Sequence, residues 1–223
     1  MKNTKLIIII TAVLGILAFA AACNMQKTAN SNGNAGTNSN MGNMPMNHDM
    51  GNMNHDQMDH SMMKSSPNAA DAPYDLQFLD TMIAHHEGAV VMAKGIEGKA
   101  QHAELNSLAK NIIADQEKEI AQMKKWREEW FKDKPPAINM EMAGMNDSMK
   151  GMDMKKLGSS TGNDLDLEFI KQMIPHHQGA VVMSTEALQK SQKNDIKTLA
   201  NGIIKAQNAE IKQMQDWQTA WKK

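Results

Sequence analysis

The chain has 223 residues, of which 41% are hydrophobic, and carries a formal charge of −1 at pH 7. This length suits one compact domain with tails and argues against two large domains. The near-neutral charge excludes the basic field that drives binding to nucleic acids. The unusual feature is the presence of 22 methionines beside a single cysteine.

Residues 1–22 have the pattern of a signal peptide, in which lysines precede an apolar run and small residues precede Cys23. The pattern resembles the lipobox of a bacterial lipoprotein, which predicts acylation of Cys23 and a lipid anchor in the membrane. Ala20 stands where Leu or Val is commoner. Cleavage after Ala22 by an ordinary signal peptidase and a retained membrane helix are therefore the alternatives. All three place the rest of the chain outside the cytoplasm, facing the periplasm or the outer surface.

Residues 23–72 are predicted to form a disordered tether, because Asn, Gly, Ser, Met and His cannot bury enough apolar surface to offset the entropy of ordering. Thioethers are soft, neutral ligands that favour Cu(I). The tether is therefore predicted to capture Cu(I) or Ag(I). A low-complexity spacer, or an oxidation sink, is the alternative. The proposed auxiliary ligands are Met44, Met46, His48, Met50, His55, His60 and Met62.

Residues 73–132 are predicted to form a first helical hairpin. Pro73 and Asp75 give a helix start signal, and the apolar residues that follow keep the three-to-four spacing of one helical face. Glycines mark the turn. The second helix is expected from about Ala103 to Phe131, where a pair of prolines then ends it.

Residues 133–164 form a second methionine-rich segment, the linker between the two repeats. No pattern of other apolar residues accompanies its methionines, so we do not expect them to pack in the core. Capture of Cu(I) is predicted here too. The methionines are Met140, Met142, Met145, Met149, Met152 and Met154.

Residues 165–223 repeat the design of the first hairpin, with Asp166 as the expected helix start. The block MIAHHEGAVVMA at 82–93 recurs as MIPHHQGAVVMS at 173–184, and the match continues without a gap to the last tryptophan of each hairpin. Neither hairpin can bury its apolar stripe alone. The two are therefore predicted to pack as an antiparallel four-helix bundle, an all-α fold.

Each hairpin places a glutamine and a glutamate on its otherwise apolar stripe, as Gln116 with Glu119 and as Gln207 with Glu210. A carboxylate that faces a core is costly unless it is paired or binds a metal. The adjacent histidines of the partner helix are the expected partners. The predicted metal ligands are Met82, His85, His86, Met92, Glu119, Met123, Met173, His176, His177, Met183, Glu210 and Met214.

The alternative for these histidines is a structural hydrogen-bond network with the glutamates that sets the register of the helices. The duplicated pairs with their flanking methionines favour the metal site. Adjacent histidines point about 100° apart on a helix, so one would bind metal while the other bonds a carboxylate or faces the neighbouring hairpin. The sequence leaves open which histidine of each pair binds the metal.

Three smaller features complete the pattern. Gly88 and Gly179 are interpreted as packing residues that allow close approach. The two tryptophan pairs that follow the glutamates are expected to close one end of the core. His102, which aligns with Lys193 in the second repeat, is expected at the surface.

The HH-x-G-A-V-V-M block and the downstream Q-x-x-E-I-x-Q-M-x-x-W pattern resemble the domain of unknown function 305 family, over 75–130 and again over 166–221. This resemblance implies a ferritin-like helical bundle. It also implies copper, since some members are periplasmic copper-binding proteins linked to copper tolerance. The tether lies outside the resemblance, so its methionines are a partly independent indication of copper.

These features together predict an exported copper-binding protein that sequesters or relays Cu(I), with Ag(I) as a second soft ion, in copper tolerance or homeostasis. A copper transporter or oxidase would be its partner, and no catalytic constellation is evident. One alternative is a ferritin-like enzyme with paired Fe or Mn, although the Glu-x-x-His motif of such sites is absent from the four predicted helices. The other is a metal-independent scaffold lipoprotein of the envelope, which would expose an apolar patch.

Overall fold

The computed structural model describes residues 64–222, which all lie in one compact unit. Every secondary-structure element in this range is helical, so the predicted all-α fold is confirmed. The predicted signal peptide, Cys23 and the predicted tether ligands from Met44 to Met62 fall outside the described residues. Among residues 64–222, no helix has the length and apolar character needed to cross a membrane.

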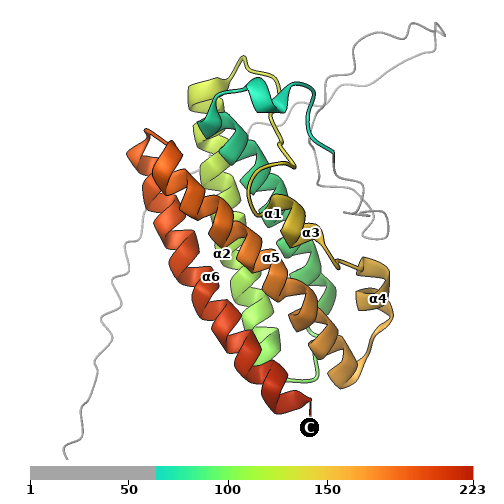
Figure 1. Cartoon of the computed structure of the whole chain (residues 1–223). Coiled ribbons are helices and arrows are strands. Elements are labelled where there is room, and N and C mark those ends of the chain that lie inside the picture. The colour runs from blue at the N-terminus through green and yellow to red at the C-terminus, as the bar shows by residue number, and fades with distance from the viewer. Residues whose placement is uncertain (1–63, 223) are drawn as a thin grey trace, which may run out of the picture. The chain divides into compact units, whose positions relative to one another are not determined.

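Four long helices dominate the described residues (Figure 1). They are α1 (Tyr74–Ile96), α2 (Ala103–Phe131), α5 (Gly162–Lys190) and α6 (Asn194–Trp221). A short 3-10 helix, η4 (Ala69–Asp71), precedes α1, and the linker contains α3 (Met145–Met149) and α4 (Met154–Ser159). The bounds of α2 agree with the helix predicted from its apolar stripe.

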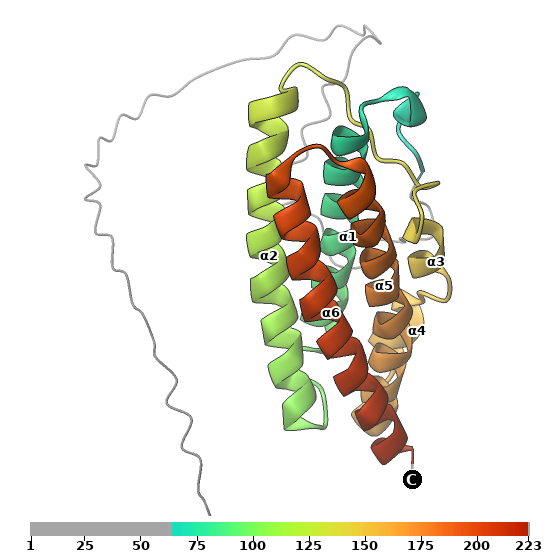
Figure 2. The ribbon, with the colours of Figure 1, turned by 60° about the vertical axis from the view of Figure 1, so that its left-hand side comes forward.

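The long helices pack as two hairpins, α1 against α2 and α5 against α6, and the hairpins meet where α1 contacts α5. Figure 2 shows the four helices side by side, with α3 and α4 next to α5. Lys193 at the start of α6 lies 4.1 Å from the centre of the Trp130 ring near the end of α2. His102 at the start of α2 stacks on Trp221 at the end of α6, with ring centres 3.8 Å apart. The helices α2 and α6 are therefore antiparallel.

Helix α5 begins at Gly162, one turn before Asp166, so the predicted start at Asp166 is wrong. The carboxylate of Asp166 instead accepts hydrogen bonds from the backbone N–H groups of Gln101 and His102 at 3.0 and 2.8 Å. It thus ties the turn before α2 to the other hairpin.

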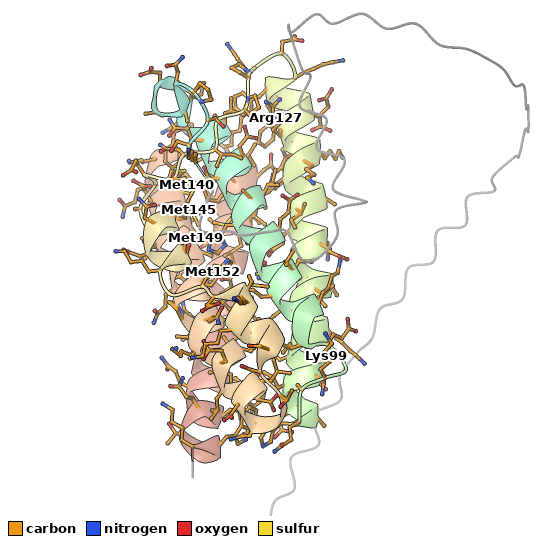
Figure 3. The ribbon with its side chains drawn as sticks, turned by 90° about the vertical axis from the view of Figure 1, so that its right-hand side faces the viewer. Lys99, Arg127, Met140, Met145, Met149 and Met152 are labelled. Carbon is orange, nitrogen blue, oxygen red and sulfur yellow. The ribbon has the colours of Figure 1, made fainter. Side chains whose placement is uncertain are left out.

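The linker packs on the bundle, and the expectation that its methionines stay out of the core is wrong. Met140, Met142 and Met145 are buried, and Met149, Met152 and Met154 are partly buried against the apolar core. Figure 3 shows the labelled linker methionines following one another along the side of the bundle. A thioether chain is unbranched and flexible, so it fills irregular gaps without needing a periodic apolar pattern.

Gly179 allows the linker to approach α5 closely, which confirms its interpretation as a packing residue. A Cβ added at Gly179 would clash with the Cβ of Ser148 in α3. Gly144, just before α3, has a φ of 87°, a conformation that L side chains rarely adopt. These two glycines together hold α3 against α5.

Candidate metal centre

The repeated histidines lie in the interior, at the contact between α1 and α5. His85, His86, His176 and His177 are each no more than 1% exposed. The rings of His85 and His176 have their centres 3.8 Å apart with an angle of 37° between their planes. The duplicated blocks therefore form one buried group of imidazoles that both hairpins share.

The second histidine of each pair is bound by the carboxylate of its own hairpin. His86 Nε2 lies 2.8 Å from Glu119 Oε2, and His177 Nε2 lies 2.8 Å from Glu210 Oε2. A carboxylate only accepts, so each Nε2–H group donates the hydrogen bond, and the Nδ1 of the neutral ring carries a lone pair. The Nδ1 atoms of His86 and His177 are both buried without a hydrogen-bond partner. A carboxylate that orients an imidazole in this way is the usual support of a metal-binding histidine.

The first histidine of repeat one also presents a lone pair. His85 Nε2 donates to the backbone carbonyl of His176 at 3.0 Å, and its Nδ1 is buried without a partner. Burial, followed by the positive charge that His86 and His177 can carry, holds the pKa of His85 well below its ordinary value of 6.5. His85 therefore stays neutral at pH values where a surface histidine would be protonated.

The six predicted methionine ligands are fully buried and divide between two apolar clusters. One cluster contains Met82, Met123 and Met183, and the other contains Met173, Met214 and Met92. The duplication maps each set onto the other. Each set takes two methionines from one hairpin and the third from the other, whereas the sequence alone groups them by repeat. The hairpins must therefore be docked before either set is complete.

Two buried glutamines also carry oxygen atoms without a hydrogen-bond partner. Gln116 and Gln207 are each 3% exposed, and the Oε1 atom of each has no hydrogen-bond partner. Like the Nδ1 atoms of His85, His86 and His177, these oxygens are hydrogen-bond acceptors whose lone pairs are free. A buried acceptor without a donor costs roughly 1–3 kcal/mol. A bound cation would satisfy such a set, so the residues present fit a metal ion.

Carboxylates contribute fewer potential metal ligands than the sequence suggests. Within residues 64–222, no group of three or more His, Cys, Asp or Glu side chains is arranged to hold a metal ion. Glu119 and Glu210 each hold one histidine instead. The donors that remain are imidazole nitrogen, thioether sulfur and amide oxygen. Nitrogen and sulfur donors of this kind suit Cu(I) better than hard cations.

Comparison with known proteins supports the resemblance found in the sequence. The model of the domain of unknown function 305 (DUF305) matches residues 20–127 and 75–218. The chain belongs to the DUF305 family. No curated protein matches this DUF305 chain.

Solved structures of relatives include CopM in several metal-bound forms. CopM in its Cu(I)-bound form is 40% identical, with a TM-score of 0.56 over 66% of this DUF305 chain and 96% of CopM. The Cu(II)-bound form gives 41% identity and a TM-score of 0.57, over 66% and 97%. A candidate secreted DUF305 protein from Streptomyces coelicolor is 27% identical, with a TM-score of 0.57 over 70% and 94%.

His102 of this DUF305 chain joins the two hairpins, and its expected place at the surface is wrong. Its side chain is 24% exposed, and its Nδ1 lies 2.7 Å from Oδ2 of the fully buried Asp166. Its ring stacks on Trp221. The sequence did not indicate this role, because the second repeat has no histidine at the position equivalent to His102. Lys193 occupies that position and contacts Trp130 in the corresponding way.

The tryptophan pairs also differ from expectation. Trp126 stacks on Trp130 with ring centres 5.3 Å apart, and Trp217 stacks on Trp221 with ring centres 5.2 Å apart. The first pair lies at the end of α2. The second pair, at the end of α6, lies near the start of α2, so the two pairs close opposite ends of the bundle. The antiparallel contact of α2 with α6 produces this arrangement, which the sequence of a single hairpin does not reveal.

Proposed function

We propose that this protein binds Cu(I), and Ag(I) in the same way, inside its helical bundle. The observation that carries the proposal is the buried set of unpartnered acceptors, His85 Nδ1, His86 Nδ1 and His177 Nδ1, in the same core as two methionine sets. Neutral imidazole and thioether groups bind Cu(I) without losing a proton.

The duplication indicates two equivalent centres. His86 would bind through Nδ1 in one centre and His177 in the other, each with thioethers of one of the two methionine sets. Glu119 and Glu210 would orient the rings and strengthen them as donors. His85 lies between the centres, against His176, where it could serve either one.

The relatives support this choice of ion. CopM, which this chain resembles over nearly the whole length of CopM, has been solved with Cu(I), Cu(II) and Ag bound. Thioether-rich sites accept both Cu(I) and Ag(I), because both ions are soft and carry a single charge. The same chemistry is proposed for the buried methionines here.

We further propose that the protein is exported, is anchored through Cys23, and sequesters copper or relays it to a transporter or oxidase. The signal-like residues 1–22 support export. The methionines and histidines of the tether would capture ions first, and the bundle would hold them more tightly. We propose a binding role and not a catalytic one.

The proposal is tested by replacing His85, His86, His176 and His177 together with Ala and titrating Cu(I) under anaerobic conditions against a competing chelator. Tight binding should be lost, and an unchanged affinity would contradict the site. Because four cavities could unfold the bundle, a second variant replaces Met82 and Met173 with Leu. This exchange conserves volume, so the fold should survive while Cu(I) affinity falls.

A further inference from the structure

The buried amides of Gln116 and Gln207 have no role in the Cu(I) centres described above. They occupy equivalent positions in α2 and α6, one turn before Glu119 and Glu210. Residues three apart share a helical face, so each glutamine faces the interior on the same stripe as the glutamate that holds a histidine. Both Oε1 atoms are buried and unpartnered.

A polar group in such a position destabilises the metal-free core. An aliphatic side chain would fill the same space without leaving an acceptor unsatisfied. The amide oxygen is also of little use to Cu(I), which prefers sulfur and imidazole nitrogen. Cu(II), in contrast, prefers nitrogen and oxygen donors. An amide oxygen on the same helical stripe as the glutamate that orients a buried imidazole therefore suits the oxidised ion.

We propose that Gln116 and Gln207 each supply an amide-oxygen ligand that allows the two centres to hold Cu(II) as well as Cu(I). Within each centre the histidine nitrogen serves both ions, the thioethers serve Cu(I), and the amide oxygen serves Cu(II). This inference rests on the proposed function, since it assigns a further ligand to the same centres.

The test is a variant with Gln116→Leu and Gln207→Leu in the full chain, titrated separately with Cu(II) in air and with Cu(I) under anaerobic conditions. Affinity for Cu(II) should fall roughly tenfold or more, while affinity for Cu(I) changes by less than about threefold. The electron paramagnetic resonance spectrum of bound Cu(II) should also change. Gln122→Leu with Gln213→Leu is the matched control, because these equivalent glutamines lie on more exposed faces of the same helices.

A readout without metal separates a ligand from a structural amide. If the amides serve only the metal, the glutamine-to-leucine variant should melt at a higher temperature than the parent in the presence of a chelator. A lower melting temperature together with unchanged Cu(II) affinity would overturn the inference. If the variant then still binds Cu(I) tightly, the proposed function stands. If the parent chain binds no copper at all, the proposed function and this inference are both wrong.

Discussion

The carboxylate bound to the second histidine of each repeat decides which nitrogen is available to a metal. His86 and His177 donate hydrogen bonds through Nε2 to Glu119 and Glu210. This leaves the lone pair of Nδ1 as the one available to a metal in both rings. The glutamates are partly exposed, at 23% and 18%, so they remain hydrated while each orients a fully buried ring.

We expect replacement of Glu119 and Glu210 by Leu to weaken Cu(I) binding by roughly 10- to 100-fold, because the rings lose both their orientation and an anionic partner. Replacement by Gln keeps an acceptor and should cost less. Competition titrations of both variants measure the difference. Glu117→Gln is the control, since Glu117 is half exposed and bonds Lys94. An equal loss in the control would contradict the assignment.

The lowered pKa of His85 makes the metal-free protein sensitive to acid. Below its ordinary pKa of 6.5 the unfolded chain takes up a proton at this residue that the folded protein does not. Stability therefore falls as pH drops below about 6.5, by up to about 1.4 kcal/mol per pH unit from this group. In His85→Phe, denaturation between pH 6.5 and 5 should show a correspondingly shallower decline. Parallel curves for the two proteins would contradict the prediction.

At the residue scale, the sequence predicted that Glu119 meets a histidine of α1, but not which of the two histidines it meets. The stripe placed Glu119 opposite the histidines of α1, and the bond to His86 follows from that spacing. The sequence could not show that His85 instead meets the carbonyl of His176, because that contact depends on how α5 docks on α1. For the same reason the sequence could not show that Met92 and Met183 each join the methionine set of the other hairpin.

At the scale of elements, the fit of the linker on α5 depends on Gly179. We expect Gly179→Ala to destabilise the protein by about 1–3 kcal/mol, since the new Cβ would push Ser148 and α3 away from α5. Gly202→Ala is the control, because nothing lies near a Cβ at that helical position, and it should stabilise α6 by up to about 1 kcal/mol. Urea denaturation measures both. A stable Gly179→Ala protein would show that α3 does not need this close approach.

The long helices could be predicted because each carries an apolar stripe over many turns, as α2 does from Leu105 to Met123. The short helices α3 and α4 could not be. They span five and six residues, which is too short to show a helical period, and they form because α5 offers a surface to pack on. Burial of Met145 in the core follows from that packing and not from any local pattern.

At the scale of the whole molecule, the duplication gives two related halves that differ at their ends. His102 binds Asp166 at one junction between the hairpins, and Lys193 contacts Trp130 at the other. Each half requires groups from both hairpins, as the two methionine sets show. Copper bound in this way would hold the hairpins together and stabilise the folded chain by an amount that grows with the logarithm of the free copper concentration.

The most direct test of two equivalent centres is the number of tightly bound Cu(I) ions per chain in an anaerobic titration against a chelator. The parent protein is compared with His86→Phe, His177→Phe and the variant that carries both changes. Phe fills the space of the imidazole but has no lone pair, and Glu119 and Glu210 can be hydrated when their partners are lost. We expect two tightly bound ions in the parent, one in each single variant and none in the double variant. Two tightly bound ions in the double variant would contradict the account.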